Sequence, residues 1–255
     1  MSARETLVTW IALLAGLFGA WSVAAATLPV PSYMLPPPTA VLTAFAELVA
    51  KGILPTYVAA SLGRMVTAAL VAFAVAVPVG LLLGTSRRVA EFVYPMLNFF
   101  QAVSGIAWLP LMLVWFGFGE RTILIAVNYT VVFPVAFNTL LGVRSVPRIY
   151  VDALRTLGAS RGRIARDVFL PGALPSIATG MRLGLAYGWR ALIAAEMLVG
   201  AHGLGFMIFS AQNFHLTARI MLGMAVIGAL WLLLDYFVLR PLEAATIARW
   251  GLVQR

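Results

Sequence analysis

Six apolar stretches recur along the chain, and each holds about 20 residues, the length that crosses a bilayer as an α-helix. They lie at approximately 7–26, 65–84, 92–116, 122–142, 176–199 and 220–239. The longest interval in which charge recurs every few residues falls within 143–175, between the fourth and fifth stretches. The pattern predicts an all-α, polytopic membrane protein in which residues 1–255 form one domain with six transmembrane helices.

The first stretch has a second interpretation as a secretory signal, because Arg4 precedes it and three alanines, Ala24–Ala26, could mark a cleavage site. Its apolar run is long for a signal, so we favour an uncleaved span. The composition fits a protein that lies mostly in lipid, since 62% of its residues are hydrophobic and its mean hydropathy is +0.96.

The charged interval contains a segment, Asp152–Pro171, whose apolar positions follow a helical period in two groups. Gly158 separates the groups, at a position where a helix can end in a left-handed residue. Ser160 can cap the second helix, and Pro171 is expected to end it. We therefore predict two short helices, with Asp152 in the first turn of one, that form a basic amphipathic hairpin against the membrane.

This segment resembles a motif of the inner-membrane permeases of binding-protein-dependent ABC importers. In that family a cytoplasmic loop has the form E-A-A, three residues, Gly, nine residues, I-x-L-P. The matching residues are Asp152, Ala153, Leu154, Gly158, Val168, Leu170 and Pro171, with Ala159 and Ser160 directly after the glycine. Asp replaces Glu, Leu replaces Ala and Val replaces Ile, so the charge or the apolar character is kept. The resemblance implies that these residues couple the permease to an ATPase, whereas an ordinary basic loop would not require this spacing.

Other segments resemble one branch of the family, the importers of nitrate, sulfonates, taurine and related small compounds. They are Leu35–Pro38, Ser61–Arg64, Leu109–Leu111 with Trp115–Gly117, and Glu196–Gly205. The resemblance covers nearly the whole chain and implies the helical fold of a type I importer permease. It also implies a homodimer of permeases, two cytoplasmic subunits that bind ATP and Mg²⁺, and an extracytoplasmic solute-binding protein. No cofactor is expected on this chain itself.

The formal net charge of +9 would suggest nucleic acid as a partner if the protein were soluble. Here the arginines gather in alternate loops, which is typical of cytoplasmic loops in membrane proteins. They stand at Arg4, Arg87, Arg88, Arg144, Arg148, Arg155, Arg161, Arg163, Arg166, Arg182, Arg240, Arg249 and Arg255. The other loops hold little beyond Lys51, Arg121 and Arg219. With the resemblance, this bias predicts a bacterial inner-membrane protein whose two termini are cytoplasmic, with lipid rather than nucleic acid around it.

The chain lacks the residues that several other functions require. It has no cysteine and only His202 and His215, so we expect no metal site. It has no G-x-x-x-x-G-K-[ST] loop and no catalytic set, so we expect ATP hydrolysis in a partner subunit and disfavour a membrane-embedded enzyme. An ATP-independent carrier or channel remains an alternative, although no inverted repeat is visible.

Polar residues inside the apolar stretches are candidates for a translocation pathway. In the third stretch Asn98, Gln101 and Ser104 are spaced three apart and form one stripe. The fourth stretch offers facing polar groups at Asn128, Thr130, Asn138 and Thr139. Hydrogen bonds between the two helices would explain these residues equally well without a pathway.

Two charged residues, Arg190 and Glu196, lie well inside the fifth stretch, where ionisable groups are costly and face protein or water. Six residues separate them, so they do not share a helix face. We favour a structural role for Glu196 and leave Arg190 open between attracting an anionic substrate and pairing with Glu196 or a carbonyl. The resemblance implies a small anion such as a sulfonate, taurine or nitrate as substrate, with a neutral heteroaromatic vitamin precursor as the alternative.

Overall fold

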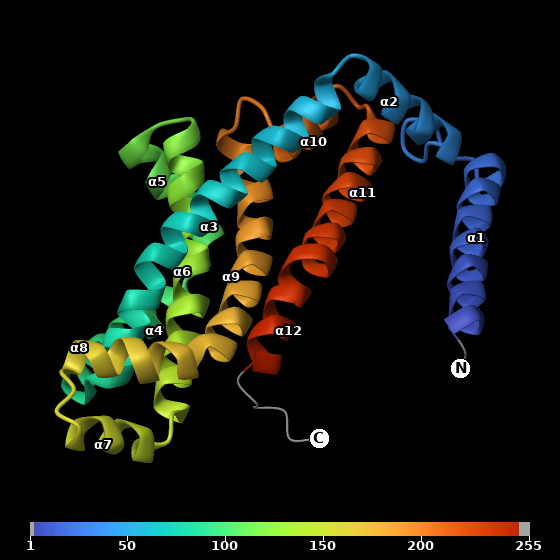
Figure 1. Ribbon diagram of the computed structural model, residues 1–255. Helices are drawn as coiled ribbons and strands as arrows, with labels where there is room; N and C mark the ends of the chain where they lie inside the picture. The colour runs from blue at the N-terminus through green and yellow to red at the C-terminus, as the bar shows by residue number, and fades with distance from the viewer. Residues whose placement is uncertain (1–2, 250–255) are drawn as a thin grey trace.

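The computed structural model describes residues 3–249, and every regular element among them is helical (Figure 1). The helices are α1 (Ala3–Thr27), α2 (Pro38–Ala50), α3 (Ile53–Thr85), α4 (Arg87–Ala102), α5 (Leu109–Phe116), α6 (Glu120–Ser145), α7 (Arg148–Thr156), α8 (Arg161–Ile164), α9 (Leu170–Val199), α10 (Leu204–Asn213), α11 (Thr217–Leu234) and α12 (Arg240–Arg249). A 3₁₀ turn, η1 (Gly105–Trp108), and two π-helical segments, η2 (Ala165–Phe169) and η3 (Asp235–Leu239), complete the order. The predicted all-α class is confirmed.

Four helices of the described chain are long and apolar enough to cross a membrane. They are Ile53–Thr85, Glu120–Ser145, Arg161–Val199 and Thr217–Thr246. In α1 the apolar part that the structure describes, Ala15–Thr27, is shorter than a full span, and so is α2. The described helices therefore support four spans, or five with the bent pair below, and the count of six stays a prediction.

The stretch 92–116, predicted as one span, is divided into two helices that meet at an angle of 81°. The chain becomes extended at Val103 and Ser104, between the end of α4 and the start of η1. At this break the Tyr129 hydroxyl donates to the carbonyl oxygens of Phe100 and, at 3.4 Å, of Val103. These contacts from α6 satisfy carbonyls at the end of α4, which the break leaves without helical partners.

The centre of the bundle is α6, which packs against both α3 and α9 (Figure 1). Val127, Val131 and Val135 of α6 have no solvent exposure. On α9 a row of glycines lets the two backbones approach closely, because a Cβ at Gly180 would lie 2.6 Å from the Asn138 Cβ and one at Gly188 2.5 Å from a Val131 methyl. The contact fixes α9 relative to α6 and with it the side chains that the two helices present.

Figure 1 places α2 across one end of the bundle, between α1 and the tops of α3 and α11, while α7 lies at the opposite end. The described start of α1 and the end of α12 lie toward the α7 end (Figure 1). Glu47 of α2 accepts from Lys51 at 2.6 Å and lies 3.4 Å from Arg219 of α11. The hydrogen bond and charge of Lys51, helped by Arg219, lower the pKa of the Glu47 carboxyl.

Candidate functional site

The segment Asp152–Pro171 begins as the sequence predicts, with two short helices joined at a bend. After α7 the backbone of Gly158 is left-handed, with φ of +76°. The Ser160 hydroxyl accepts from the backbone N–H of Arg163 at 3.4 Å and so caps α8. The placement of Asp152 in the first turn was wrong, because α7 already begins at Arg148.

The prediction that Pro171 ends the second helix was also wrong. The chain is helical without interruption from Arg161 to Val199, through α8, the π-helical segment η2 and α9. Pro171 lies in the first turn of α9, directly after η2. A π-helical turn changes the hydrogen-bond ladder locally, so a residue without an N–H can follow it without breaking the helix. The hairpin is therefore continuous with a candidate membrane span.

One face of the hairpin is buried and the other is open. Val151, Ile164 and Val168 are buried together, with Leu154 and Ala159 packed against them. The open face carries Ile149, Tyr150 and Leu157, which are 72%, 59% and 83% exposed, together with the exposed motif residues Asp152, Ala153, Gly158 and Ser160. The motif residues Leu170 and Pro171 are half-buried at the start of α9. Large apolar side chains next to charges on an open face are typical of a protein contact surface.

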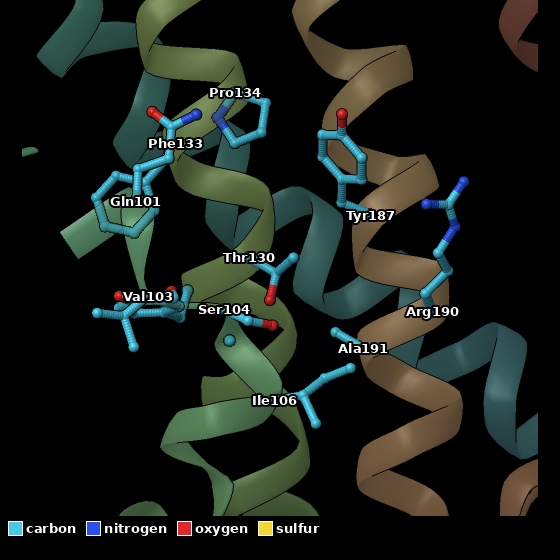
Figure 2. Close-up of a pocket in the computed structure, with 12 residues that line it drawn as sticks. Gln101, Val103, Ser104, Ile106, Thr130, Phe133, Pro134, Tyr187, Arg190 and Ala191 are labelled. Atoms are coloured by element: carbon cyan, nitrogen blue, oxygen red, sulfur yellow. Dashed lines mark hydrogen bonds between the residues drawn. The ribbon is translucent and has the colours of Figure 1, made fainter. Parts of the chain in front are cut away.

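A cavity of about 410 Å³ lies between the α4–η1 break, α6 and α9 (Figure 2). Gln101, Ser104 and Arg190, three of the predicted pathway residues, line it together with Thr130. The rest of the lining is largely aromatic and apolar: Val103, Gly105, Ile106, Tyr129, Phe133, Pro134, Tyr187 and Ala191. The cavity thus combines a few polar groups with an apolar wall, as small-molecule sites do.

Arg190 is the charged side chain in this lining, and it is exposed. Its guanidinium carbon lies 5.7 Å from the centre of the Tyr187 ring, and Figure 2 shows the side chain extending along α9 toward that ring. Within the described chain no carboxylate lies within ion-pair distance of it. The predicted alternative in which Arg190 pairs with Glu196 is therefore wrong.

The predicted hydrogen bonds from Asn98, Gln101 and Ser104 to the polar side chains of the fourth stretch are absent from the described chain. The four polar side chains predicted to face the third stretch instead donate to a carbonyl one turn earlier on α6 itself, in the pairs Asn128–Leu124, Thr130–Ala126, Asn138–Pro134 and Thr139–Val135 at 2.7–2.9 Å. Gln101 and Ser104 make no side-chain hydrogen bond to the described residues and so face the cavity with free polar groups. Asn98, Asn128 and Asn138 are not in the lining.

Glu196 belongs to a different site, a buried charge cluster near the start of α10. Its side chain has no solvent exposure, and its carboxylate accepts from the Arg64 guanidinium at 2.7 Å and from the Ser61 hydroxyl at 2.8 and 2.9 Å. The backbone N–H of Gly205 donates to it at 2.9 Å. The favoured structural role of Glu196 agrees with this geometry, but its partner is Arg64 of α3.

Arg64 joins three helices, although the sequence did not single it out as a site residue. Its guanidinium also donates to both carboxylate oxygens of Glu120, at the start of α6, and at 2.7 Å to the carbonyl of His202. Only 5% of its side chain is exposed. A signal was available, since Ser61 and Arg64 are polar residues one turn apart in an apolar helix and a lone buried glutamate requires a cation.

A second charge cluster lies toward the α7 end of the bundle and joins α9 to η3 and α12. Arg182 donates to Asp235 at 2.7 Å and to Glu243 at 2.9 Å, and Arg240 donates to Asp235 at 2.9 Å. Asp235 is 12% exposed and Arg182 is 35% exposed, so this cluster is less buried than the one around Glu196. Both clusters have the partners that buried charges need.

The chain is similar to several transport permeases. The chain is 38% identical over 239 residues to the taurine transport system permease protein TauC of Escherichia coli. The alignment covers 92% of this chain and 86% of TauC. It is 31% identical to the putative aliphatic sulfonates transport permease protein SsuC of Bacillus subtilis, covering 86% of this chain and 79% of that protein. It is 32% identical to the nitrate import permease protein NrtB of Synechocystis, covering 70% and 65%.

The fold also matches a solved structure, an inward-facing conformation of the MetNI methionine ABC transporter. The TM-score is 0.65 over 76% of this chain and 96% of that chain, at 21% identity. Residues 76–242 match the family described as binding-protein-dependent transport system inner membrane component. The chain belongs to this family and is a permease subunit of an ABC importer.

Proposed function

We propose that this permease forms the pathway for a small anion such as a sulfonate, taurine or nitrate. The observation that carries the proposal is Arg190 in the wall of the cavity between α6 and α9, without a carboxylate partner among the described residues. A guanidinium offers a planar fork of donors that matches the oxygens of an oxyanion. Taurine, aliphatic sulfonates and nitrate, for which three relatives are named, each contain an oxyanion group.

The other polar groups of the cavity fit a pathway rather than a tight binding site. Gln101, Ser104 and Thr130 can replace part of the hydration shell of an anion, while Tyr129 and Phe133 supply a wall without charge. Among the described residues that line the cavity, Arg190 is the single cation. One guanidinium attracts an anion without holding it as strongly as several would, which transport requires because the substrate must leave.

We further propose that the open face of α7 binds a separate ATPase that hydrolyses ATP with Mg²⁺, since this chain has no phosphate-binding loop of its own. The exposed Ile149, Tyr150 and Leu157 suit such a contact. The uninterrupted helix from Arg161 to Val199 supports a mechanical link, because displacement of α8 would be passed to α9, which carries Arg190. A second permease copy and a solute-binding protein at the α2 end complete the proposed importer.

The proposed topology has six spans in a bacterial inner membrane, with both termini and α7 in the cytoplasm. It rests on the arginine bias and on the position of the described ends of α1 and α12 toward the α7 end (Figure 1). Since the chain has no cysteine, single substitutions test it directly. In intact cells a membrane-impermeant maleimide should label Lys51→Cys and spare Ser160→Cys, and the reverse pattern would contradict the topology.

The function is tested with the permease reconstituted in proteoliposomes with its ATPase and solute-binding protein. For transporters whose ATPase faces the vesicle lumen, we expect uptake of labelled taurine or nitrate that requires ATP in the lumen. This uptake should stop when the ATPase is omitted. Uptake without ATP would favour an ATP-independent carrier. ATP-dependent uptake of a neutral heteroaromatic compound, with no uptake of any anion, would favour the alternative substrate and contradict the role of Arg190.

A further inference from the structure

Four arginines surround two adjoining cavities at the end of the bundle that carries α7. Arg144 and Arg148 line both cavities, whose volumes are about 420 and 570 Å³. Arg155 takes part in the lining of the first and Arg87 in that of the second. The last residues of α3 form a wall that the two cavities share. The cations therefore face hollows rather than a flat surface.

The charges around these cavities do not balance within the described chain. Two of the arginines have carboxylate partners, in the pairs Arg87–Glu91 at 2.7 Å and Arg155–Asp152 at 3.5 Å. Arg144 and Arg148 have no carboxylate within ion-pair distance among the described residues. Arg148 also opens α7, where the helix dipole disfavours a cation and the first turn holds no acidic residue. An anion from outside the chain would offset both charges.

Exposed apolar side chains lie one helical turn before residues that line the cavities. Leu141 precedes Arg144 by one turn of α6 and is 60% exposed, and Leu82 precedes Thr85 by one turn of α3 and is 54% exposed. Both helices are candidate membrane spans that end at these cavities. In the proposed topology the cations would therefore lie at the level of the lipid headgroups and these apolar side chains at the level of the acyl chains.

We propose that Arg144 and Arg148 bind the phosphate of an anionic phospholipid. Guanidinium groups bind phosphate oxygens through paired hydrogen bonds, and basic cavities at the cytoplasmic ends of membrane helices suit anionic headgroups. The assignment to the cytoplasmic leaflet rests on the proposed topology. Because Arg148 is the first residue of α7, a bound headgroup would hold the hairpin at the membrane surface.

The test uses the whole transporter, with its ATPase and solute-binding protein, in nanodiscs of phosphatidylcholine with or without phosphatidylglycerol. Native mass spectrometry counts the lipids retained by the wild type, by Arg144→Gln/Arg148→Gln and by the charge-keeping Arg144→Lys/Arg148→Lys. A matched control is Arg161→Gln/Arg166→Gln, which removes two exposed arginines that have no carboxylate partner in the described chain and lie outside both cavities.

We expect the wild type and the control to retain phosphatidylglycerol in preference to phosphatidylcholine. In the Arg144→Gln/Arg148→Gln variant the ratio of retained phosphatidylglycerol to phosphatidylcholine should fall roughly tenfold. The lysine variant should keep most of it. Equal loss in the control would reduce the effect to general surface charge and overturn the site. If the wild type shows no lipid preference but binds inorganic phosphate, the ligand is a free anion. If the glutamine variant alone loses the ATPase, the two arginines belong to the contact with the ATPase. Both results would contradict the proposal, and neither depends on which substrate is transported.

Discussion

Arg190 and Glu196 lie six residues apart on α9, yet their surroundings are opposite. Glu196 has no solvent exposure and contacts a guanidinium, a hydroxyl and a backbone N–H. Arg190 is exposed, lines a cavity and has no carboxylate partner in the described chain. The bundle supplies Glu196 with every contact that a buried charge needs, whereas Arg190 keeps its charge available. Charge inside an apolar helix therefore indicates a functional site only when its partners are missing.

The two residues should consequently respond to mutation in different ways. Loss of a charge from the Glu196 cluster should act on stability, because a buried partner is left unpaired. Loss of the Arg190 charge should act on transport with little effect on stability. The predictions below separate these outcomes, starting with the largest effect.

The largest effect is expected from Arg64→Met. It leaves the Glu196 carboxylate buried with only the Ser61 hydroxyl and the Gly205 N–H, and removing one partner of a buried ion pair costs about 3–5 kcal/mol. The change should appear as a lower unfolding free energy in denaturant titrations of the purified complex. The double variant Arg64→Met/Glu196→Met should recover part of the loss, since it leaves no buried charge unpaired, and Glu120, which also loses Arg64, is half-exposed to solvent. A single variant as stable as the wild type would contradict the structural role of the cluster.

A smaller loss is expected at the other charge cluster. Arg182→Gln removes the hydrogen bonds from α9 to Asp235 and Glu243, but about a third of the Arg182 side chain is exposed and solvent screens the pair. We expect destabilisation of about 1–2 kcal/mol, below that of Arg64→Met. Hydrogen exchange should increase in α11 and α12 and stay unchanged in α3. Equal losses for the two variants would show that burial does not distinguish the clusters.

The smallest stability effect is expected from Gly158→Ala. A Cβ at Gly158 would meet no atom within 4 Å, so the cost is the left-handed backbone alone, about 1 kcal/mol. Gly162→Ala is the matched control, because its Cβ also meets nothing but its φ is not in the left-handed region. We expect Gly158→Ala to weaken co-purification of the ATPase and Gly162→Ala to leave it unchanged. The same ATPase content in both variants would argue against the bend as part of the contact.

The sequence predicted those features that depend on neighbouring residues. The helical class, the bend at Gly158 and the cap at Ser160 follow from local chemistry, and the structure has all three. The bend within 92–116 was not predicted, because Tyr129, which donates to carbonyls at the break, belongs to another helix. The prediction that Pro171 ends a helix was wrong, because the helix continues through it after the π-helical turn η2.

The site was predictable only in part for the same reason. Gln101, Ser104 and Arg190 were named from their polarity in apolar stretches, and the structure brings them to one cavity. Asn98, Asn128 and Asn138 were named by the same rule but lie outside it. Arg64 was missed as the partner of Glu196 because 132 residues separate the two in the chain, and spacing along a sequence carries no information on such a pair.

The most direct measurement compares ATP-dependent uptake of a labelled anion by the wild type, Arg190→Gln and Arg190→Lys, reconstituted with equal amounts of ATPase and solute-binding protein. The unfolding free energy is measured on the same preparations. We expect Arg190→Gln to keep the wild-type stability and to lose roughly tenfold in uptake, the equivalent of one charge-assisted hydrogen bond, and Arg190→Lys to retain an intermediate rate. Wild-type uptake by Arg190→Gln, or a loss of stability as large as that of Arg64→Met, would contradict the assignment of Arg190 to the anion pathway.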